Sequence, residues 1–195
     1  MPTQQLQDLL NQSADLHDHL CPKQVLGVRM GMYAAELFGL ALPQSDKRLL
    51  TIVETDGCFS DGIAVSTGCW LGHRTLRYVD YGKVAATFID TFSGEAVRLH
   101  PSNTSRKRAA HYAPTAQSQW HAYLEGYQVM PSGELLVAER VVLLCPVEQL
   151  VSSPDRRAVC DICHEEIING REVVSHGRAM CRGCADRSYF TRCSR

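Results

Sequence analysis

Residues 16–22 read LHDHLCP, so two imidazoles and a thiol alternate directly before a long apolar run. In extended backbone, side chains at alternate positions point the same way, so we expect His17, His19 and Cys21 to converge on one point. Proline is tolerated in the first turn of a helix, so Pro22 predicts that a helix begins here, with Cys21 at its N-terminus. Backbone N–H groups favour a thiolate there. Nitrogen and sulfur ligands on one face indicate a transition-metal site, with an amphipathic surface and a packed cysteine as the alternative.

Helices are expected on both sides of this stretch. Residues 3–16 carry leucines at helical spacing, which predicts an amphipathic first helix. From 22 to 40 the apolar residues spread around the helix, which indicates burial on more than one side. Gly27 and Gly31 each cost about 1 kcal/mol relative to alanine inside a helix. We therefore expect another backbone to approach closely at these two positions.

A second chemical stretch, ETDGCFSDG, follows a predicted strand over residues 48–54. Ser60 and Asp61 are good N-caps, so we expect a helix from about residue 61 that ends near Cys69. Cys58 would also lie beside a helix N-terminus, where a thiolate is favoured. Cys69 would lie at the far end of that helix, too far from Cys58 to share one ion, so we interpret it as a packing or cleft-lining residue.

The remaining pattern up to residue 144 predicts an α+β fold, in which an antiparallel sheet packs against helices. Short Gly-containing turns between strands predict antiparallel hairpins. A basic segment around Arg106 is expected to be a solvated loop, with phosphate or nucleic-acid contact as the less favoured alternative. We expect strands at 75–81, 83–92, 95–100 and 135–144, a loop at 101–114 and a helix at 115–129.

The clearest motif lies near the C-terminus and consists of two CxxC pairs separated by seventeen residues, namely Cys160, Cys163, Cys181 and Cys184. This doubled spacing is typical of a structural zinc site with four thiolates. Asn169-Gly170 predicts a hairpin between the pairs, and a helix is expected from the second pair through Phe190. A knuckle, a hairpin and a ligand-bearing helix describe a treble-clef zinc finger. We therefore expect a core domain over 1–150, a linker over 151–158 and the finger over 159–195.

Composition narrows the classes of function. The chain has 195 residues, of which 45% are hydrophobic and 21% charged, with a formal net charge of −1. These values are typical of a globular protein, and they do not favour binding to nucleic acid or to an anionic membrane. We see no signal peptide and no apolar run long enough to span a bilayer. Nine cysteines without an export signal favour reduced, metal-binding thiols and a cytoplasmic location.

Four short motifs together resemble the formylmethanofuran dehydrogenase E-subunit family, mainly over residues 14–100. They are His17-x-His19-x-Cys21-Pro22 with Leu26-Gly27-x-Arg29, Glu54-x-Asp56-x-Cys58-x-x-Asp61, Thr67-Gly68-Cys69, and Asp80-Tyr81-Gly82-Lys83. The resemblance implies an α+β core that forms a homodimer, with a cleft where the first two motifs meet and bind metal. It implies four core ligands, His17, His19, Cys21 and Cys58, and further cleft groups at Asp56, Asp61, Cys69 and Lys83. It also implies a C-terminal treble clef in some members. Asp18 and Lys23 depart from the usual glycines of the family.

Three hypotheses for function follow. The first is a metal-binding accessory or catalytic subunit of a redox or one-carbon enzyme, with zinc in the finger and a second transition ion, zinc or iron, in the core. The second is a zinc-finger module that binds nucleic acid or a protein partner. The third is a thiol redox protein that uses Cys21 and Cys58 as a dithiol.

Overall fold

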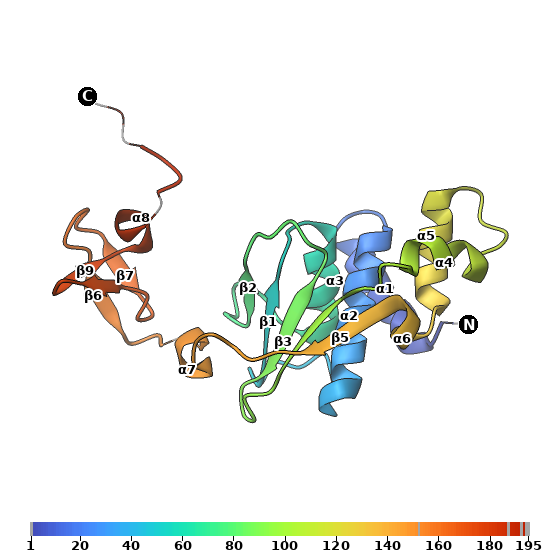
Figure 1. Ribbon diagram of the computed structural model, residues 1–195, viewed down its shortest axis with the longest axis horizontal. Helices are drawn as coiled ribbons and strands as arrows, with labels where there is room; N and C mark the ends of the chain where they lie inside the picture. The colour runs from blue at the N-terminus through green and yellow to red at the C-terminus, as the bar shows by residue number, and fades with distance from the viewer. Residues whose placement is uncertain (1, 152, 187, 192, 194–195) are drawn as a thin grey trace. The chain divides into compact units, whose positions relative to one another are not determined.

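The structure, a computed structural model, describes residues 2–151, 153–186, 188–191 and 193, and divides the chain into two compact units, Met1–Leu144 and Cys145–Arg195 (Figure 1). The first unit is an α+β domain, as the sequence predicts. In chain order its elements are α1 (Gln4–Asp15), α2 (Pro22–Phe38), β1 (Leu49–Val53), α3 (Cys58–Thr67), β2 (Leu76–Tyr78), β3 (Ala86–Asp90), β4 (Ala96–Pro101), α4 (Ser105–Tyr112), α5 (Gln119–Val129), α6 (Ser132–Leu135) and β5 (Leu136–Arg140).

The sheet of this unit is mixed, with strand order β2-β1-β3-β4-β5. β1 pairs in parallel with β2 and antiparallel with β3, so the expected hairpin between 75–81 and 83–92 is wrong. Because β1 and β2 are joined through α3, they form a crossover connection, which brings them together in parallel. The chain after β2 wraps around the end of β1, where the N–H groups of Tyr81 and Lys83 donate to the Glu54 carbonyl at 3.0 and 3.2 Å. This wrap carries Lys83 to the end of the sheet.

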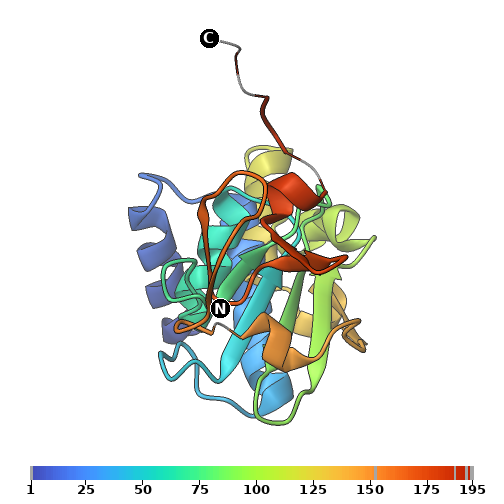
Figure 2. The ribbon, with the colours of Figure 1, turned by 90° about the vertical axis from the view of Figure 1, so that its left-hand side faces the viewer.

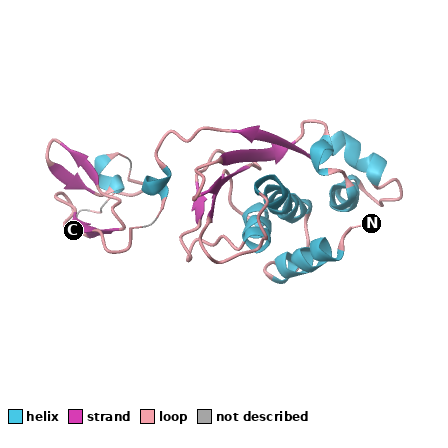
Figure 3. Ribbon diagram, turned by 90° about the horizontal axis from the view of Figure 1, so that it is seen from below, coloured by secondary structure: helices cyan, strands magenta, loops and turns pink. Residues whose placement is uncertain are grey.

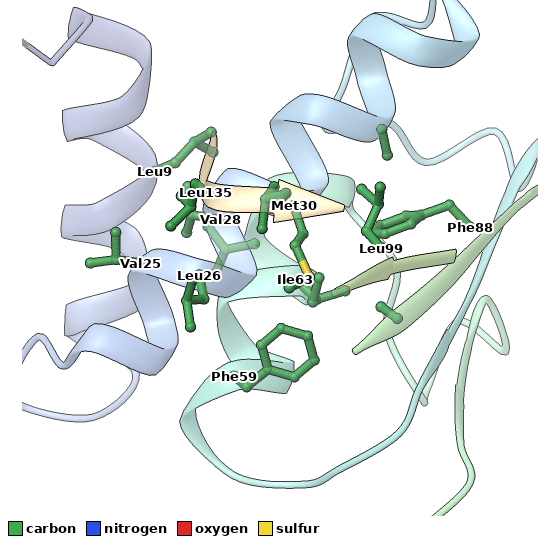
Figure 4. Packing of buried hydrophobic residues seen from close by; sticks show 14 of the residues in the cluster. Leu9, Val25, Leu26, Val28, Met30, Phe59, Ile63, Phe88, Leu99 and Leu135 are labelled. Carbon is green, nitrogen blue, oxygen red and sulfur yellow. The ribbon is translucent and has the colours of Figure 1, made fainter. Parts of the chain in front are cut away.

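Helices α1, α2 and α3 cover one side of the curved sheet (Figure 3). The closest helix contact is between α2 and α3, and it depends on glycine. A Cβ on Gly27 would collide with the Phe59 carbonyl, and a Cβ on Gly62 would collide with the Gln24 carbonyl. The predicted close approach at Gly27 is therefore confirmed. Figure 4 shows the core that results, which includes Val28, Met30, Phe59, Ile63, Phe88 and Leu99, all at 0% exposure.

A helical hairpin, α4 and α5, occupies the segment before β5, and the expected solvated loop at 101–114 is wrong. The sequence of α4 is strongly basic, but its buried face needs only small residues, because Ala109 packs against Gly126 of α5. Arg29 of α2 fixes the end of α5. Its guanidinium donates to the carbonyls of Tyr127 and Met130, both at 2.7 Å. Burial disfavours the charged form of Arg29 and lowers its pKa. The backbone carbonyl oxygens that accept from the guanidinium stabilise the cation there.

The second unit contains α7 (Val147–Leu150), β6 (Arg157–Val159), β7 (Glu166–Ile168), β8 (Val173–Ser175), β9 (Arg178–Met180) and α8 (Arg182–Ala185), drawn in orange and red in Figure 2. β6 pairs with β7 and β8 pairs with β9, both antiparallel. The hairpin predicted at Asn169-Gly170 is therefore wrong, since that turn joins two strands that pair with other partners. The turn of the second hairpin lies instead at His176-Gly177, where both residues have positive φ. Helix α8 ends at Ala185, so it is shorter than expected, and residue 187 lies outside the described residues.

Within the described parts of the chain, no helix combines the length and the apolar character that crossing a membrane would require.

Candidate functional site

The four cysteines of the second unit converge. The Sγ atoms of Cys160, Cys163, Cys181 and Cys184 all lie within 4.8 Å of one another. A tetrahedral zinc ion with Zn–S bonds of ~2.3 Å places its sulfurs roughly 3.8 Å apart. The Sγ atoms of Cys163 and Cys181 are 3.9 Å apart, which matches this spacing. The cluster can therefore hold a metal ion, and its donor set is consistent with zinc.

The protonation of these thiols also fits a site for a cation. Backbone N–H groups of Cys163 and Cys181 lower the pKa of Cys160 to about 6, and the N–H of Cys181 lies 3.3 Å from its sulfur. The neighbouring Cys181 thiol raises the pKa of Cys184 to about 12. Crowded thiolates repel one another, so the four cannot all ionise without a positive ion between them. A bound divalent metal would supply that charge.

The first unit brings together two cysteines that are far apart in sequence. Cys21 is the N-cap of α2, as Pro22 predicts, and Cys58 is the first residue of α3. Helix α3 begins earlier than expected, since Gly57 is its N-cap at φ 76° and Ser60 bonds back to the Gly57 carbonyl at 2.7 Å. Burial raises the pKa of Cys58, and hydrogen bonding with the Cys21 thiol raises it further. The two thiols therefore lie close enough to influence each other's ionisation.

The histidines are arranged differently from the prediction. Asp18 adopts a left-handed conformation at φ 58°, so residues 17–21 are not extended and the expected alternation is wrong. Aspartate tolerates this conformation better than most residues, but alternation of residue types does not reveal it. His17 Nε2 lies 2.5 Å from the Asp61 carboxylate, and His19 Nδ1 lies 2.7 Å from the His17 carbonyl. Asp61 thus orients His17 and leaves its Nδ1 as the nitrogen available to a metal.

Not all four core candidates meet at one point. Within the described chain, the finger cysteines are the one set of three or more His, Cys, Asp or Glu ligand atoms that lie within 4.8 Å of each other. The structure pairs Cys21 with Cys58 and His17 with Asp61, and both pairs join the segment before α2 to the first turns of α3. His19 is exposed, and Asp56 lies on the loop between β1 and α3. Cys69 is buried in the core, where its thiol contacts Thr51 and the Leu49 carbonyl. It therefore packs in the core and does not line the cleft with Cys21 and Cys58, contrary to what the resemblance implies.

A cleft of about 870 Å³ opens beside the two core thiols. Cys21 and Cys58 lie in its wall, together with Lys83. The remaining lining comes from the first turns of α2, from the loop before β3, from β4 and the residues after it, and from the helical hairpin α4–α5. Its size is that of a cleft for a small molecule.

Two residues that support this site, Gln24 and Arg98, were not singled out from the sequence. Gln24 is fully buried, and its Oε1 accepts the Cys21 N–H at 2.7 Å while its amide donates to the Ser13 carbonyl at 2.7 Å. Arg98 lines the cleft and forms a two-pronged ion pair with Glu54 at 2.6 and 2.8 Å, which lowers the pKa of Glu54. The available signal for Gln24 was a polar residue directly before the apolar run that starts at Val25. Nothing local in the sequence pairs Glu54 with Arg98.

Comparison with known proteins agrees with this architecture. A family model described as "FmdE, Molybdenum formylmethanofuran dehydrogenase operon" matches residues 16–137. A protein of Archaeoglobus fulgidus named "Probable S-adenosyl-L-methionine-binding protein" is 38% identical over 102 residues, which cover 51% of this chain and 28% of that relative. The chain thus spans less than a third of that protein. A solved FmdE-like protein of Syntrophus aciditrophicus, described as related to a tungsten formylmethanofuran dehydrogenase, shares the fold, with a TM-score of 0.59 and 18% identity over 95% of each chain.

Proposed function

The chain belongs to the FmdE family, and from this membership and the geometry of its core we propose that it binds a second transition-metal ion beside the cleft. The ion would be zinc or iron, held by Cys21 and Cys58 with help from the histidines. The protein would act as an accessory or catalytic subunit of a redox or one-carbon enzyme. Sulfur and imidazole nitrogen are suitable ligands for both metals.

The observation that carries the proposal is that Cys21 and Cys58 lie close to each other and both line the wall of the cleft. The two residues come from different helices, so the fold itself brings them together. Each lies in the first turn of its helix, where a coordinated thiolate is stabilised by the backbone dipoles. His17 is oriented by Asp61, an arrangement common around metal-binding imidazoles. A metal that keeps an open position here could polarise a carbonyl group or activate water in the cleft.

Metal analysis of the purified chain tests the proposal. We expect about two equivalents of metal per chain in the wild type, one in each unit, since a structural four-cysteine site binds one ion. Cys58→Ala should lose one equivalent and keep the other. Cys184→Ala should lose the finger metal and keep the core metal, so the double variant should be nearly metal-free.

Cys69→Ala is the matched control, because it removes a buried core thiol that lies outside the proposed site. It should keep the full metal content. A wild-type chain that carries a single equivalent, still present in full in Cys58→Ala, would show that the core does not bind metal as proposed.

The closeness of the two thiols in the wall of the cleft also supports a second candidate function, a thiol redox protein. Cys21 and Cys58 would form a disulfide while a disulfide of a partner is reduced to two thiols, so electrons and protons balance. Alkylation followed by mass spectrometry separates the two functions. Protection of both cysteines that is lost on chelation supports metal binding. Labelling that is unaffected by chelator and blocked by oxidised glutathione supports the redox function.

The finger is less suited to nucleic acid than its arginine content suggests. Arg156 pairs with Glu172 at 3.4 Å, and Arg157 pairs with Glu166 at 2.7 Å. These carboxylates offset part of the positive charge that phosphate binding would use. We propose that zinc in the finger stabilises the second unit, which is too small to fold on an apolar core alone.

We also propose that the chain forms a homodimer in the cytoplasm and assembles with a larger enzyme. All nine cysteines are free thiols, which agrees with a reducing compartment. Analytical ultracentrifugation of the purified chain should give a mass about twice that of the 21.7 kDa protomer. A single species at the protomer mass would contradict the dimer.

A further inference from the structure

The cleft beside Cys21 and Cys58 is strongly biased in charge. Lys23, Lys83 and Arg106 all line it, and none of the described residues in its wall is acidic. No described carboxylate forms an ion pair with these three cations, whereas most other arginines of this unit are paired or held by backbone oxygens. Lys83 Nζ lies 5.9 Å from the centre of the Tyr81 ring, which carries no negative charge to offset it. An unbalanced positive cleft attracts anions.

The other two basic groups of the wall have carboxylate partners, whereas Arg106 interacts with the neutral Tyr127 side chain. Arg98 is held by Glu54 and Glu139, and His100 lies 3.9 Å from Glu139. Arg98 and, to a smaller extent, Lys83 lower the pKa of Glu54, but both oxygens of that carboxylate are bonded to Arg98. The charge of Arg98 therefore serves the fold. The three remaining cations come from separate segments, α2, the loop before β3, and α4, so their convergence on one cavity is a property of the tertiary structure.

One wall of the cleft is aromatic. Trp120, Tyr123 and Tyr127 follow one face of α5 and line the cavity. The Tyr123 and Tyr127 rings stack with centres 5.7 Å apart and planes 3° from parallel. Tyr127 is buried, whereas Trp120 is 45% exposed, so the wall runs from the core to the rim of the cavity. A flat ring could stack against such a wall.

We propose that this cleft binds a small aromatic molecule that carries an anionic phosphate group. The phosphate would bind between Lys23, Lys83 and Arg106, and the ring would stack on the aromatic wall of α5. Lysine and arginine are the usual phosphate-binding side chains, and a volume of about 870 Å³ accommodates a molecule the size of a nucleotide. The ligand would bind beside the proposed metal ion, so its role as a substrate rests on the proposed function.

Isothermal titration calorimetry of the full-length, metal-loaded chain with AMP and with phenyl phosphate tests this proposal. We expect saturable binding of at least one probe, weaker at high salt because the cations are exposed. Adenosine and inorganic phosphate, which each lack one half of AMP, should bind at least about tenfold more weakly. No saturation by either aromatic phosphate at about 10 mM, above the ordinary range of Michaelis constants up to ~1 mM, would overturn the proposal. Inorganic phosphate that binds as tightly as AMP would overturn the aromatic part.

Charge-reversal variants locate the binding. Lys83→Glu and Arg106→Glu should each weaken binding at least about tenfold. Lys107→Glu is the matched control, because it makes the same change of charge next to Arg106 on α4 but does not line the cleft. Its affinity should stay within about twofold of the wild type. Trp120→Ala should weaken binding at least about fivefold, because it removes a ring on which the ligand would stack. Equal losses of affinity in Lys83→Glu and Lys107→Glu would show that the ligand is attracted non-specifically and would overturn the proposed binding site.

The Cys58→Ser variant separates this inference from the proposed function. It removes a proposed metal ligand and leaves the basic and aromatic lining in place. Binding of AMP that persists in this variant supports the cleft even if the core metal proves absent. Binding that disappears in Cys58→Ser, and that Lys83→Glu leaves unchanged, would mean that the metal alone holds the phosphate, which contradicts the role given to the cations.

Discussion

Gln24 is a polar side chain that helps to position a candidate metal ligand from inside the core. It is fully buried in α2, accepts the N–H of Cys21, and donates to the carbonyl and hydroxyl of Ser13 at 2.7 and 3.2 Å. The end of α1 and the start of α2 are therefore tied together through one amide. Because the amide is sealed from water, its partners cannot be replaced by solvent.

We expect Gln24→Leu to lower the free energy of unfolding by about 1–3 kcal/mol, since it leaves the partly buried N–H of Cys21 and the buried carbonyl of Ser13 without this partner. Urea denaturation followed by circular dichroism measures the loss. Gln12→Leu, the same change at an exposed position of α1, should alter stability by no more than about 0.5 kcal/mol. Equal stability of the two variants would show that the Gln24 amide contributes nothing.

Asp90 gives the fold a dependence on pH. Arg48 donates to both of its carboxylate oxygens, at 3.0 and 2.7 Å, and this hydrogen bonding lowers the pKa of Asp90 from 3.8 to about 2. A carboxyl whose pKa is lower in the folded chain contributes its full stability above the unfolded value. That contribution is lost as the pH falls from 3.8 through about 2.

The wild type should therefore lose more stability over this acid range than Asp90→Asn, which has no such carboxyl to titrate. Denaturant midpoints measured at a series of pH values from about 5 to about 2 check the difference. Asp15→Asn, at the exposed end of α1, should follow the wild-type curve. A parallel loss in wild type and Asp90→Asn would remove Asp90 from the explanation of acid sensitivity.

At the scale of elements, the packing of α2 on α3 sets the distance between Cys21 and Cys58. The two helices approach closely because Gly27 faces the Phe59 carbonyl and Gly62 faces the Gln24 carbonyl. Each thiol lies in the first turn of its helix, near these contacts. A wider separation of the helices would move the thiols apart.

Gly27→Ala should lower stability by about 1–2 kcal/mol. The added Cβ would collide with the Phe59 carbonyl oxygen, so the cost of overpacking should be in the upper part of its range of about 1–3 kcal/mol, and the gain of about 1 kcal/mol in helix propensity offsets only part of it. The same variant should lose core metal at constant finger metal. Thermal denaturation and metal analysis measure the two effects. Gly133→Ala, where an added Cβ meets nothing within 4 Å, should be neutral or slightly stabilising. A Gly27→Ala variant with the stability and the core metal content of the wild type would contradict the close packing of α2 on α3.

The sequence predicts some of these elements well and others not at all. The pattern around Pro22 predicts α1 and α2 to within a few residues, because their apolar spacing and the proline act locally. The partner of β2 was predicted wrongly, since the turn at Tyr81-Gly82 signals a change of direction but does not name the neighbouring strand. In the same way, α4 was missed because its buried side is made of small residues. Pairing and small-residue packing are decided by the tertiary structure.

The same distinction applies to the site. Cysteine spacing alone predicts the cluster around Cys160. The resemblance of motifs implies that Cys21 and Cys58 lie close together. The orientation of the histidines could not be predicted, because it depends on the left-handed backbone at Asp18. The cations of the cleft could not be predicted either, since their lack of acidic neighbours only becomes visible once distant segments are folded together.

At the scale of the whole molecule, the chain consists of two units that are stabilised in different ways. The first has an extensive apolar core, with Phe59, Phe88 and Leu99 all fully buried. The second has few buried apolar side chains among its described residues, chiefly Cys160 and Ile167. Its two hairpins and α8 meet instead at the four cysteines. Metal binding should therefore be coupled to folding in the second unit alone.

We expect a strong chelator, or the variant Cys184→Ser, to unfold the second unit while the first unit stays folded. Zinc binding contributes ~10–16 kcal/mol to zinc-finger peptides at neutral pH, far more than the buried apolar surface of this unit can replace. Two-dimensional amide NMR should show loss of dispersion for residues 157–185 only, and limited proteolysis should remove the same segment. Cys193→Ser changes a thiol that is exposed and outside the cluster, and should leave both spectra and cleavage unchanged. A second unit that keeps its dispersed signals without metal, or a first unit that unfolds with it, would show that the four cysteines do not act as the separate structural centre described.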